Sequence, residues 1–167
     1  MPESHPDEMV AHDFSLPNVG PGPDPFSMSD IDDTVAFVVV MFQRDHLCTN
    51  CRNQVKTVSQ RYDAFRARDA EVISIIPEPK NKVAEWQAEY DLPYPLLADP
   101  ETAVGDQYEQ PVRFGVLGQF SDFLGRMPEI AVIDRRGSVA RVAYLHKGRS
   151  TFDRPEVEDL LAELDSL

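Results

Sequence analysis

The two cysteines of the chain lie three residues apart, in Cys48-Thr-Asn-Cys51. Residues at positions i and i+3 of a helix lie on one face, about 5–6 Å apart. This separation is within the Cα distance that a disulfide can span. The spacing therefore allows the pair to cycle between dithiol and disulfide with little backbone movement. A thiolate formed here would be a nucleophile toward a disulfide or a peroxide.

The pair is predicted to lie where a buried strand leads into a helix. The free N–H groups and the positive dipole of a helix N-terminus stabilise a thiolate. Arg44 and Arg52 are close in sequence and would lower the thiol pKa further, as would His46 if it is protonated. The alternative for His46 is a bystander role in a surface loop. We expect Cys48 to attack first, because it meets the helix end and solvent before Cys51 does.

Two other interpretations of the cysteine pair stay open. One is half of a zinc site that His46 or His146 completes, although structural zinc generally requires a second closely spaced pair, which the sequence lacks. The other is two inert buried thiols. A lone pair directly after a central strand favours redox chemistry. We therefore predict a redox-active pair with no metal and no cofactor.

Hydrophobic patterns predict the elements that position this pair. The continuous apolar run over residues 35–42 is typical of a strand buried on both faces. Apolar residues at spacings of three and four, from Val55 to Phe65, predict a helix that ends at Asp69-Ala70. Further strands are predicted at 71–76, 95–98 and 129–134, with helices at 80–90 and 100–108, a hairpin turn at 135–137, a returning strand at 138–145 and a last helix from Pro155.

This order of elements predicts an α/β fold with an antiparallel edge. The chain has 167 residues, no internal repeat and no second block of distinct composition, so we expect one domain over residues 13–167. Residues 1–12 are predicted to be a flexible N-terminal tail.

The charge balance excludes several classes of partner. Lys plus Arg is 16 and Asp plus Glu is 29, which gives a net charge of −13. Nucleic acids and anionic membrane surfaces attract basic patches, so neither is an expected partner. The longest apolar run has eight residues, and crossing a bilayer takes roughly 20. The N-terminus also lacks a secretory signal pattern, so we expect a cytoplasmic protein. The acidic, Lys-poor composition suggests a cytoplasm of high salt content, with an ordinary acidic protein as the alternative.

The strand before Cys48, the cysteine pair and the helix after it resemble the thioredoxin fold. More narrowly, the chain resembles the alkyl hydroperoxide reductase / thiol-specific antioxidant family, which is peroxiredoxin-like. The segment 13–17 resembles the family's N-terminal strand, and 130–134 followed by Arg-Arg-Gly resembles its late strand and turn. The resemblance covers roughly residues 12 to 165. It implies a three-layer sandwich, with a central mixed sheet and helices on both faces.

The resemblance also implies a function. The implied function is that of a thiol-dependent oxidoreductase, which reduces peroxides or protein disulfides and is regenerated by a thioredoxin-like protein or a low-molecular-weight thiol. The alternatives are a non-catalytic, redox-responsive binding protein of the same fold and a zinc-stabilised structural domain. The apolar segment 110–125 is a candidate partner or homodimer surface, against the alternative that it packs as core or lid.

The two related families assign different roles to the cysteines. Peroxiredoxins carry Pro-x-x-x-Thr-x-x-Cys, and alignment through Phe42 puts Arg44 at the Pro, Cys48 at the Thr and Cys51 at the peroxide-attacking Cys. Cys51 would then become a sulfenic acid that Cys48 resolves. In a thioredoxin, Cys48 attacks the partner and Cys51 resolves the mixed disulfide. The absent Pro and Thr favour thiol–disulfide exchange.

Two further residues follow from the resemblance. The position of the family's catalytic arginine falls on Pro128, with Arg126 two residues earlier. Arg126 is therefore a candidate contact for a thiolate or a peroxide oxygen, and a solvated loop arginine is its alternative. Pro128 matches the cis-proline that faces the cysteine pair of thioredoxins, so we expect a cis bond and a site-shaping role.

Overall fold

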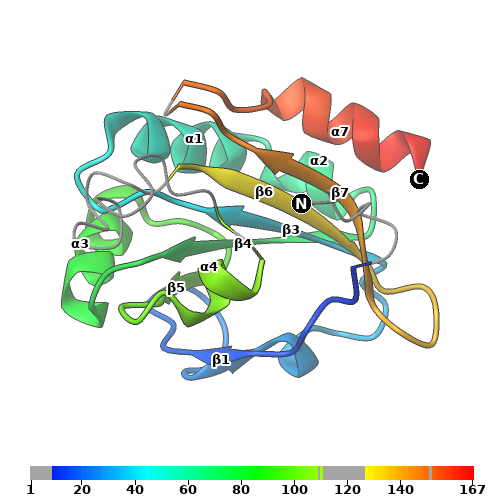
Figure 1. Cartoon of the computed structure of the whole chain (residues 1–167), viewed down its shortest axis with the longest axis horizontal. Coiled ribbons are helices and arrows are strands. Elements are labelled where there is room, and N and C mark those ends of the chain that lie inside the picture. The colour runs from blue at the N-terminus through cyan, green and yellow to red at the C-terminus, as the bar shows by residue number, and fades with distance from the viewer. Residues whose placement is uncertain (1–8, 109, 111–126, 151) are drawn as a thin grey trace.

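The computed structural model describes residues 9–108, 110, 127–150 and 152–167, and its centre is a mixed five-stranded sheet (Figure 1). The strand order is β5-β4-β3-β6-β7. The first three of these strands are mutually parallel, whereas β6 is antiparallel to β3 and β7 is antiparallel to β6. The strands are β3 (Phe37–Phe42), β4 (Ala70–Ile76), β5 (Leu96–Ala98), β6 (Glu129–Asp134) and β7 (Arg141–Lys147).

Helices cover both faces of the sheet (Figure 1). One face packs against four helices, α1 (Thr49–Gln60), α2 (Tyr62–Arg66), α3 (Lys80–Tyr90) and α7 (Val157–Ser166). The other face packs against α4 (Ala103–Gln107) and an N-terminal layer made of β1 (Ser15–Leu16), β2 (Phe26–Ser27) and the short 3-10 helix η2 (Met28–Asp30). The predicted three-layer, thioredoxin-like α/β fold is confirmed.

The central strand β3 connects the two cores. All six of its side chains are buried. Val39 and Met41 enter the core beneath α1 and α7, and Val38, Val40 and Phe42 enter the core on the other face. A strand between two helical layers has no solvent face, which explains why its sequence is apolar throughout. The sheet therefore buries the end of β3, and the short loop after it leads to the cysteine pair.

The helix predicted to run from the cysteines to Asp69 is divided in two. Arg61 leaves the helical conformation, with φ −113° and ψ 15°, and its N–H turns back to the carbonyl of Val58, 3.0 Å away. The chain then restarts as α2, which buries Phe65 in the same core as α1. The apolar spacing continues across Arg61, because α1 and α2 both bury side chains in the same core.

The returning strand of the hairpin begins later than predicted. β7 starts at Arg141 rather than at position 138. The Asp134 carboxylate accepts the backbone N–H of Arg136 at 2.9 Å, which sets a turn at the end of β6. The connection from that turn to β7 is longer than a tight hairpin, so pairing with β6 is delayed.

The described part of the predicted N-terminal tail lies along β7. The Ala11 N–H donates to the Ala140 carbonyl, and the Met9 carbonyl accepts the Val142 N–H, each at 2.9 Å. Residues 1–8 lie outside the described part of the chain. Over the residues that the structure describes, none of the helices has both the length and the apolar character needed to cross a membrane.

Candidate active site

Cys48 and Cys51 form a disulfide at the N-terminus of α1, after the short loop that follows β3. Their Cα atoms are 5.2 Å apart, as the spacing of one helical turn predicts. Cys48 is the N-cap residue, and its Sγ accepts the backbone N–H of Cys51 at 3.2 Å. The two residues are 3% and 0% exposed, respectively. Both sulfurs therefore lie in a largely dry environment, in which nearby charges act strongly.

A cation reaches these sulfurs from a distant part of the chain. Arg154, in the loop between β7 and α7, directs Nη2 to the Sγ of Cys51 at 2.9 Å and to the Sγ of Cys48 at 3.6 Å. Burial, together with the smaller effect of the positive charge of Arg44, lowers the pKa of Arg154 to about 10. The guanidinium is still protonated at neutral pH. It is therefore a positive charge placed against the disulfide.

Two neutral amides fix the direction of this guanidinium. The Nη1 of Arg154 donates to Gln54 Oε1 at 2.6 Å and to Gln43 Oε1 at 3.1 Å. Gln43 is fully buried just beyond β3, and its Nε2 donates to the hydroxyl of Ser74 on β4 at 3.2 Å. The sheet and α1 thus supply neutral acceptors that orient Arg154.

The loop that carries Arg154 is anchored by Asp153. Its carboxylate accepts the backbone N–H of Arg149 at 2.8 Å and lies 3.1 Å from the Nε2 of His146 on β7. The hydrogen bond from Arg149 holds the pKa of Asp153 below its ordinary value, and the charge of His146 adds to this effect. A carboxylate thereby fixes the loop one residue before the guanidinium.

The residues predicted from nearby sequence turn their side chains elsewhere. The Nε of Arg44 pairs with Asp45 at 2.5 Å, its backbone N–H lies 3.4 Å from Cys51 Sγ, and among the contacts of the described residues its charge acts on Arg154 rather than directly on a sulfur. The Nδ1 of His46 lies 2.9 Å from a carboxylate oxygen of Glu78. Proximity in sequence therefore gives a backbone donor in one case and an ion pair away from the sulfurs in the other.

Arg52 joins α1 to α3. Its Nε donates to the His46 carbonyl at 2.9 Å, and its Nη1 donates to Glu89 and to the Tyr90 hydroxyl at 3.2 and 3.3 Å. Its guanidinium also lies 5.5 Å from the centre of the Trp86 ring. Among the contacts of the described residues, the side chain of Arg52 reaches neither sulfur.

The prediction of a cis bond at Pro128 is wrong. Among the described residues the cis peptide bond is Asp24–Pro25, and Pro128 follows a trans bond. The Pro128 carbonyl accepts the Gly148 N–H at 2.8 Å, so this residue extends the pairing of β6 with β7. A Cβ on Gly148 would come within 2.8 Å of the proline Cγ, which shows how closely the two pack. Arg126 and positions 111–125 of the predicted partner surface lie outside the described residues.

Sequence reasoning missed Arg154. It is one of 12 arginines and stands 103 residues from Cys51, directly before the proline that predicted the start of the last helix. Neither its spacing nor its neighbours signal a contact with the cysteines. The one available signal is that Arg154 stands directly before the predicted start of the last helix. This position does not indicate which residues its side chain contacts.

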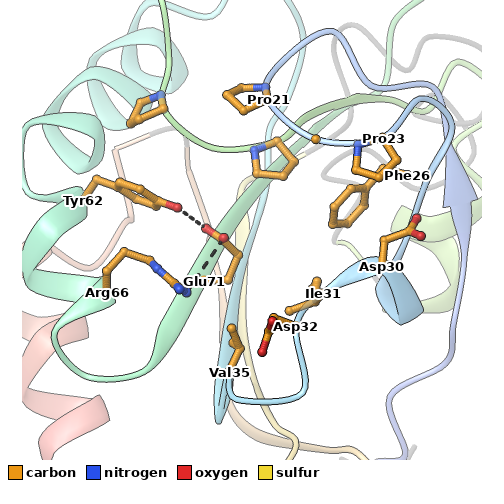
Figure 2. Close-up of a pocket in the computed structure, with 13 residues that line it drawn as sticks. Pro21, Pro23, Phe26, Asp30, Ile31, Asp32, Val35, Tyr62, Arg66 and Glu71 are labelled. Atoms are coloured by element: carbon orange, nitrogen blue, oxygen red, sulfur yellow. Dashed lines mark hydrogen bonds and ion pairs between the residues drawn. The ribbon is translucent and has the colours of Figure 1, made fainter.

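A cavity lies at the opposite end of β4 from the disulfide, with a volume of about 220 Å³ (Figure 2). Prolines line it, together with a cluster on α2 and β4 in which the Glu71 carboxylate accepts the Tyr62 hydroxyl at 2.8 Å and faces Arg66 at 3.9 Å. Burial and this hydrogen bond raise the pKa of Tyr62. These polar groups are satisfied by one another, and the lining holds no cysteine.

A metal site was an alternative for the cysteines. Within the described part of the chain, no group of three or more His, Cys, Asp or Glu residues is arranged to hold a metal ion. The two sulfurs that a zinc site would use are joined to each other.

The fold and the disulfide at a helix N-terminus define a protein of the thioredoxin-like class. Residues 8–142 match the model of the AhpC/TSA family, and the chain therefore belongs to the AhpC/TSA family. The chloroplastic peroxiredoxin Q of Suaeda salsa is 30% identical over 109 residues, which is 64% of this chain and 46% of that protein. The chain thus spans about half the length of this curated relative.

Solved structures show the same fold. Peroxidoxin BcpB of Mycobacterium tuberculosis has a TM-score of 0.74 at 22% identity, covering 95% of both chains. The 2-Cys peroxiredoxin of Plasmodium vivax has a TM-score of 0.76 at 17% identity, covering 94% of this chain and 93% of that one. A Chlorobium tepidum protein described as thiol:disulfide interchange protein DsbE has a TM-score of 0.65 at 23% identity, covering 93% and 96%.

Proposed function

We propose that this AhpC/TSA protein is a thiol peroxidase that cycles Cys48 and Cys51 between dithiol and disulfide. One observation carries the proposal, which is the disulfide at the start of α1 with the Arg154 guanidinium 2.9 Å from Cys51 Sγ. A cation held against a cysteine favours the thiolate, and the thiolate is the form that attacks a peroxide. The family membership and the curated peroxiredoxin relative support a peroxide as the substrate.

The contacts support Cys51 as the attacking sulfur, in place of the Cys48 expected from chain order. Cys51 Sγ faces the guanidinium at 2.9 Å and the Arg44 N–H at 3.4 Å. Cys48 Sγ faces the Cys51 N–H at 3.2 Å, and the same guanidinium is farther away at 3.6 Å. Hydrogen bonds from a charged donor are roughly twice as strong as neutral ones. The pKa difference between the two thiols should therefore favour ionisation of Cys51.

The reaction balances with the two cysteines as the electron source. The Cys51 thiolate attacks one peroxide oxygen, the O–O bond breaks, and the leaving oxygen takes a proton as water or alcohol. Cys51 is then a sulfenic acid. Cys48 attacks that sulfur, its own proton leaves with the hydroxyl as water, and the disulfide forms. Reduction of the disulfide by two electrons and two protons, from a thioredoxin-like protein or a low-molecular-weight thiol, completes the cycle.

Reduction of protein disulfides is the second candidate. It is favoured by the one-turn cysteine pair, in which the N-terminal residue is the less buried of the two. In that case Cys48 would attack the partner and Cys51 would resolve. A redox-responsive binding protein without turnover is the third candidate.

We also propose that the protein is cytoplasmic and that neither nucleic acid nor a membrane is its partner. A homodimer is one proposed form of assembly.

Single-cysteine variants test the proposal. Reduced Cys48→Ser protein should consume one equivalent of hydrogen peroxide and carry a sulfenic acid at Cys51, detected by dimedone labelling and mass spectrometry. Reduced Cys51→Ser should react at least tenfold more slowly. If instead Cys51→Ser traps a mixed disulfide through Cys48, and wild type reduces insulin but not peroxide, the disulfide-exchange function replaces the peroxidase.

A further inference from the structure

The loop between β7 and α7 brings Arg154 to the disulfide, and in Figure 1 it runs alongside the start of α1. The α7 side of this loop is fixed by local structure. Glu156 is the N-cap residue of α7 and forms a capping box with Asp159. Pro155 favours an extended backbone at Arg154, the residue before it. The position of Arg154 therefore depends on what fixes the β7 side of the loop.

His146, near the end of β7, contacts this loop. It pairs across the sheet with Ile130, whose side chain lies in the core beneath α1 and α7, so His146 points to the face that carries the disulfide. The Nε2 of His146 lies 3.1 Å from the Asp153 carbonyl oxygen and 3.1 Å from an oxygen of the Asp153 carboxylate. A carbonyl and an ionised carboxylate only accept hydrogen bonds, so Nε2 carries a proton. A single N–H thus holds both the backbone and the side chain of Asp153.

Gly148 lets the loop lie against the end of the sheet. A Cβ at this position would be 2.9 Å from the Asp153 carbonyl oxygen and 2.9 Å from that of Pro128, which is closer than Cβ atoms come to other atoms in proteins. The Gly148 N–H donates to the same Pro128 carbonyl at 2.8 Å, so the glycine is itself fixed to the residue before β6. The close approach of Asp153 to β7 therefore requires both the donor of His146 and a residue without a side chain at 148.

The Asp153 carboxylate links this contact to the rest of the loop. One of its oxygens lies beside His146, and the other accepts the Arg149 N–H at 2.8 Å. Arg154 follows directly, and its Nη2 ends 2.9 Å from Cys51 Sγ. When the backbone next to a long side chain is already fixed, less conformational entropy is lost as the side chain reaches its partner. The hydrogen bonds of Asp153 therefore favour the placement of the guanidinium at the sulfur.

We propose that His146 is a positioning residue that holds Arg154 against the redox pair through Asp153. The proposal rests on the proposed function and identifies a residue on which its thiolate depends. In the reduced protein, the hydrogen bonds from His146 to Asp153 keep the guanidinium beside Cys51, and the guanidinium stabilises the thiolate. Among the contacts of the described residues, His146 itself reaches neither sulfur. Its effect on Cys51 should therefore disappear when Arg154 is removed.

The test measures the pKa of Cys51 in the reduced Cys48→Ser protein, from the ultraviolet absorbance of the thiolate against pH. His146→Phe keeps a ring but removes the N–H donor. This variant should raise the Cys51 pKa by about 0.5–1 unit, as the net contribution of one hydrogen bond implies. His146→Gln keeps an N–H donor at a similar distance from the backbone and should return the pKa to the value of the parent protein. An unchanged pKa in His146→Phe would overturn the proposal, as would equal shifts in the two variants.

A double-mutant cycle with Arg154→Met separates positioning from a direct effect. Once Arg154→Met has raised the Cys51 pKa, adding His146→Phe should raise it no further. Additive shifts would overturn the proposal, because His146 would then act by a route that does not include Arg154.

His46→Phe is the matched control, because it also removes a histidine from a contact with a carboxylate, that of Glu78 at 2.9 Å. It should leave the Cys51 pKa unchanged, although His46 is far closer to Cys51 in sequence than His146 is. A shift as large as that of His146→Phe would overturn the proposal.

NMR of the wild-type protein tests the contact without any substitution, and so decides the question if His146→Phe does not fold. In long-range ¹H–¹⁵N spectra, the neutral ring of His146 should carry its proton on Nε2, and a proton on Nδ1 would overturn the proposal. Peroxide consumption by the wild-type protein is measured separately. Its failure would remove the peroxidase function, while the pKa of Cys51 would still decide the role of His146.

Discussion

The guanidinium of Arg154 lies 2.9 Å from the sulfur of Cys51, although 103 residues separate them in sequence. Arg154 comes from the loop before the last helix, and Cys51 belongs to the first turn of α1. The strand-to-helix junction supplies the cysteine pair, and the far end of the chain supplies the charge that acts on it. The chemistry of the pair therefore depends on the docking of the β7–α7 loop.

Removing the charge should lower the reactivity of the reduced protein. We expect Arg154→Met to raise the pKa of the Cys51 thiol and to slow its reaction with hydrogen peroxide by about 10- to 100-fold at pH 7, since a charged hydrogen bond is worth about 1.5–3 kcal/mol. Arg154→Lys should recover part of the rate. Iodoacetamide reactivity against pH gives the thiol pKa in each variant.

Arg149→Met is the matched control for Arg154→Met, because it removes an arginine from the same loop whose side chain is 95% exposed. It should react with peroxide at the wild-type rate. A similar loss in both variants would show that the loop, rather than the Arg154 charge, is responsible.

The amide that orients Arg154 should matter for folding as well as for rate. Gln43→Leu leaves the Arg154 Nη1 without one of its acceptors and the Ser74 hydroxyl without its donor, inside the protein. A buried group that loses its partner costs about 1–3 kcal/mol. Urea unfolding should show a decrease of this size in the free energy of unfolding. An unchanged midpoint would mean that the network contributes nothing to stability.

Acidification should loosen the loop between β7 and α7, because it protonates Asp153. Its pKa is depressed in the folded protein, so its contribution is complete above the ordinary aspartate value and is lost as the pH falls through the folded value. Asp153→Asn should therefore lose peroxide reactivity about threefold at neutral pH, through a weaker hydrogen bond to the Arg149 N–H. In the wild-type protein, the same weakening of the hydrogen bond to the Arg149 N–H should occur only at acidic pH, where Asp153 is protonated. NMR titration of the Arg149 amide follows both, and an amide insensitive to acid would contradict the prediction.

Arg52 was expected to tune the thiols, and its contacts predict a different effect. Arg52→Ala removes the bond to the His46 carbonyl and the packing on Trp86. We expect a loss of about 1 kcal/mol in the free energy of unfolding, because the side chain contributes packing as well as charge. The Cys51 thiol pKa should stay within experimental error of wild type. A clear rise in that pKa would restore the tuning role.

The net charge of −13 predicts a response to salt. Self-repulsion of a highly acidic chain is screened as the Debye length falls from about 10 Å at 0.1 M to about 3 Å at 1 M salt. The thermal unfolding midpoint should therefore rise between these KCl concentrations. Equal midpoints would indicate an ordinary acidic protein rather than one adapted to high salt.

Local sequence was sufficient for the central strand and for the position of the sulfurs. The apolar run before Phe42 predicts a strand with no solvent face, and the three-residue spacing of Cys48 and Cys51 predicts a bridge across one helical turn. Both outcomes depend on interactions between residues near in sequence, since burial patterns and helix geometry are periodic. The α/β fold followed from the order of these patterns.

Only the tertiary structure decided which groups surround the sulfurs. Arg44, His46 and Arg52 are near in sequence, but their side chains turn to carboxylates and carbonyls that satisfy them. Arg154 reaches the sulfurs because β7 runs back beside β6 and delivers the next loop to the start of α1. Pro128 follows a trans bond, and its carbonyl extends the same strand pair. The spacing of residues along the chain fixes which side chains can share a helical turn, and the packing of the sheet fixes which distant charge faces them.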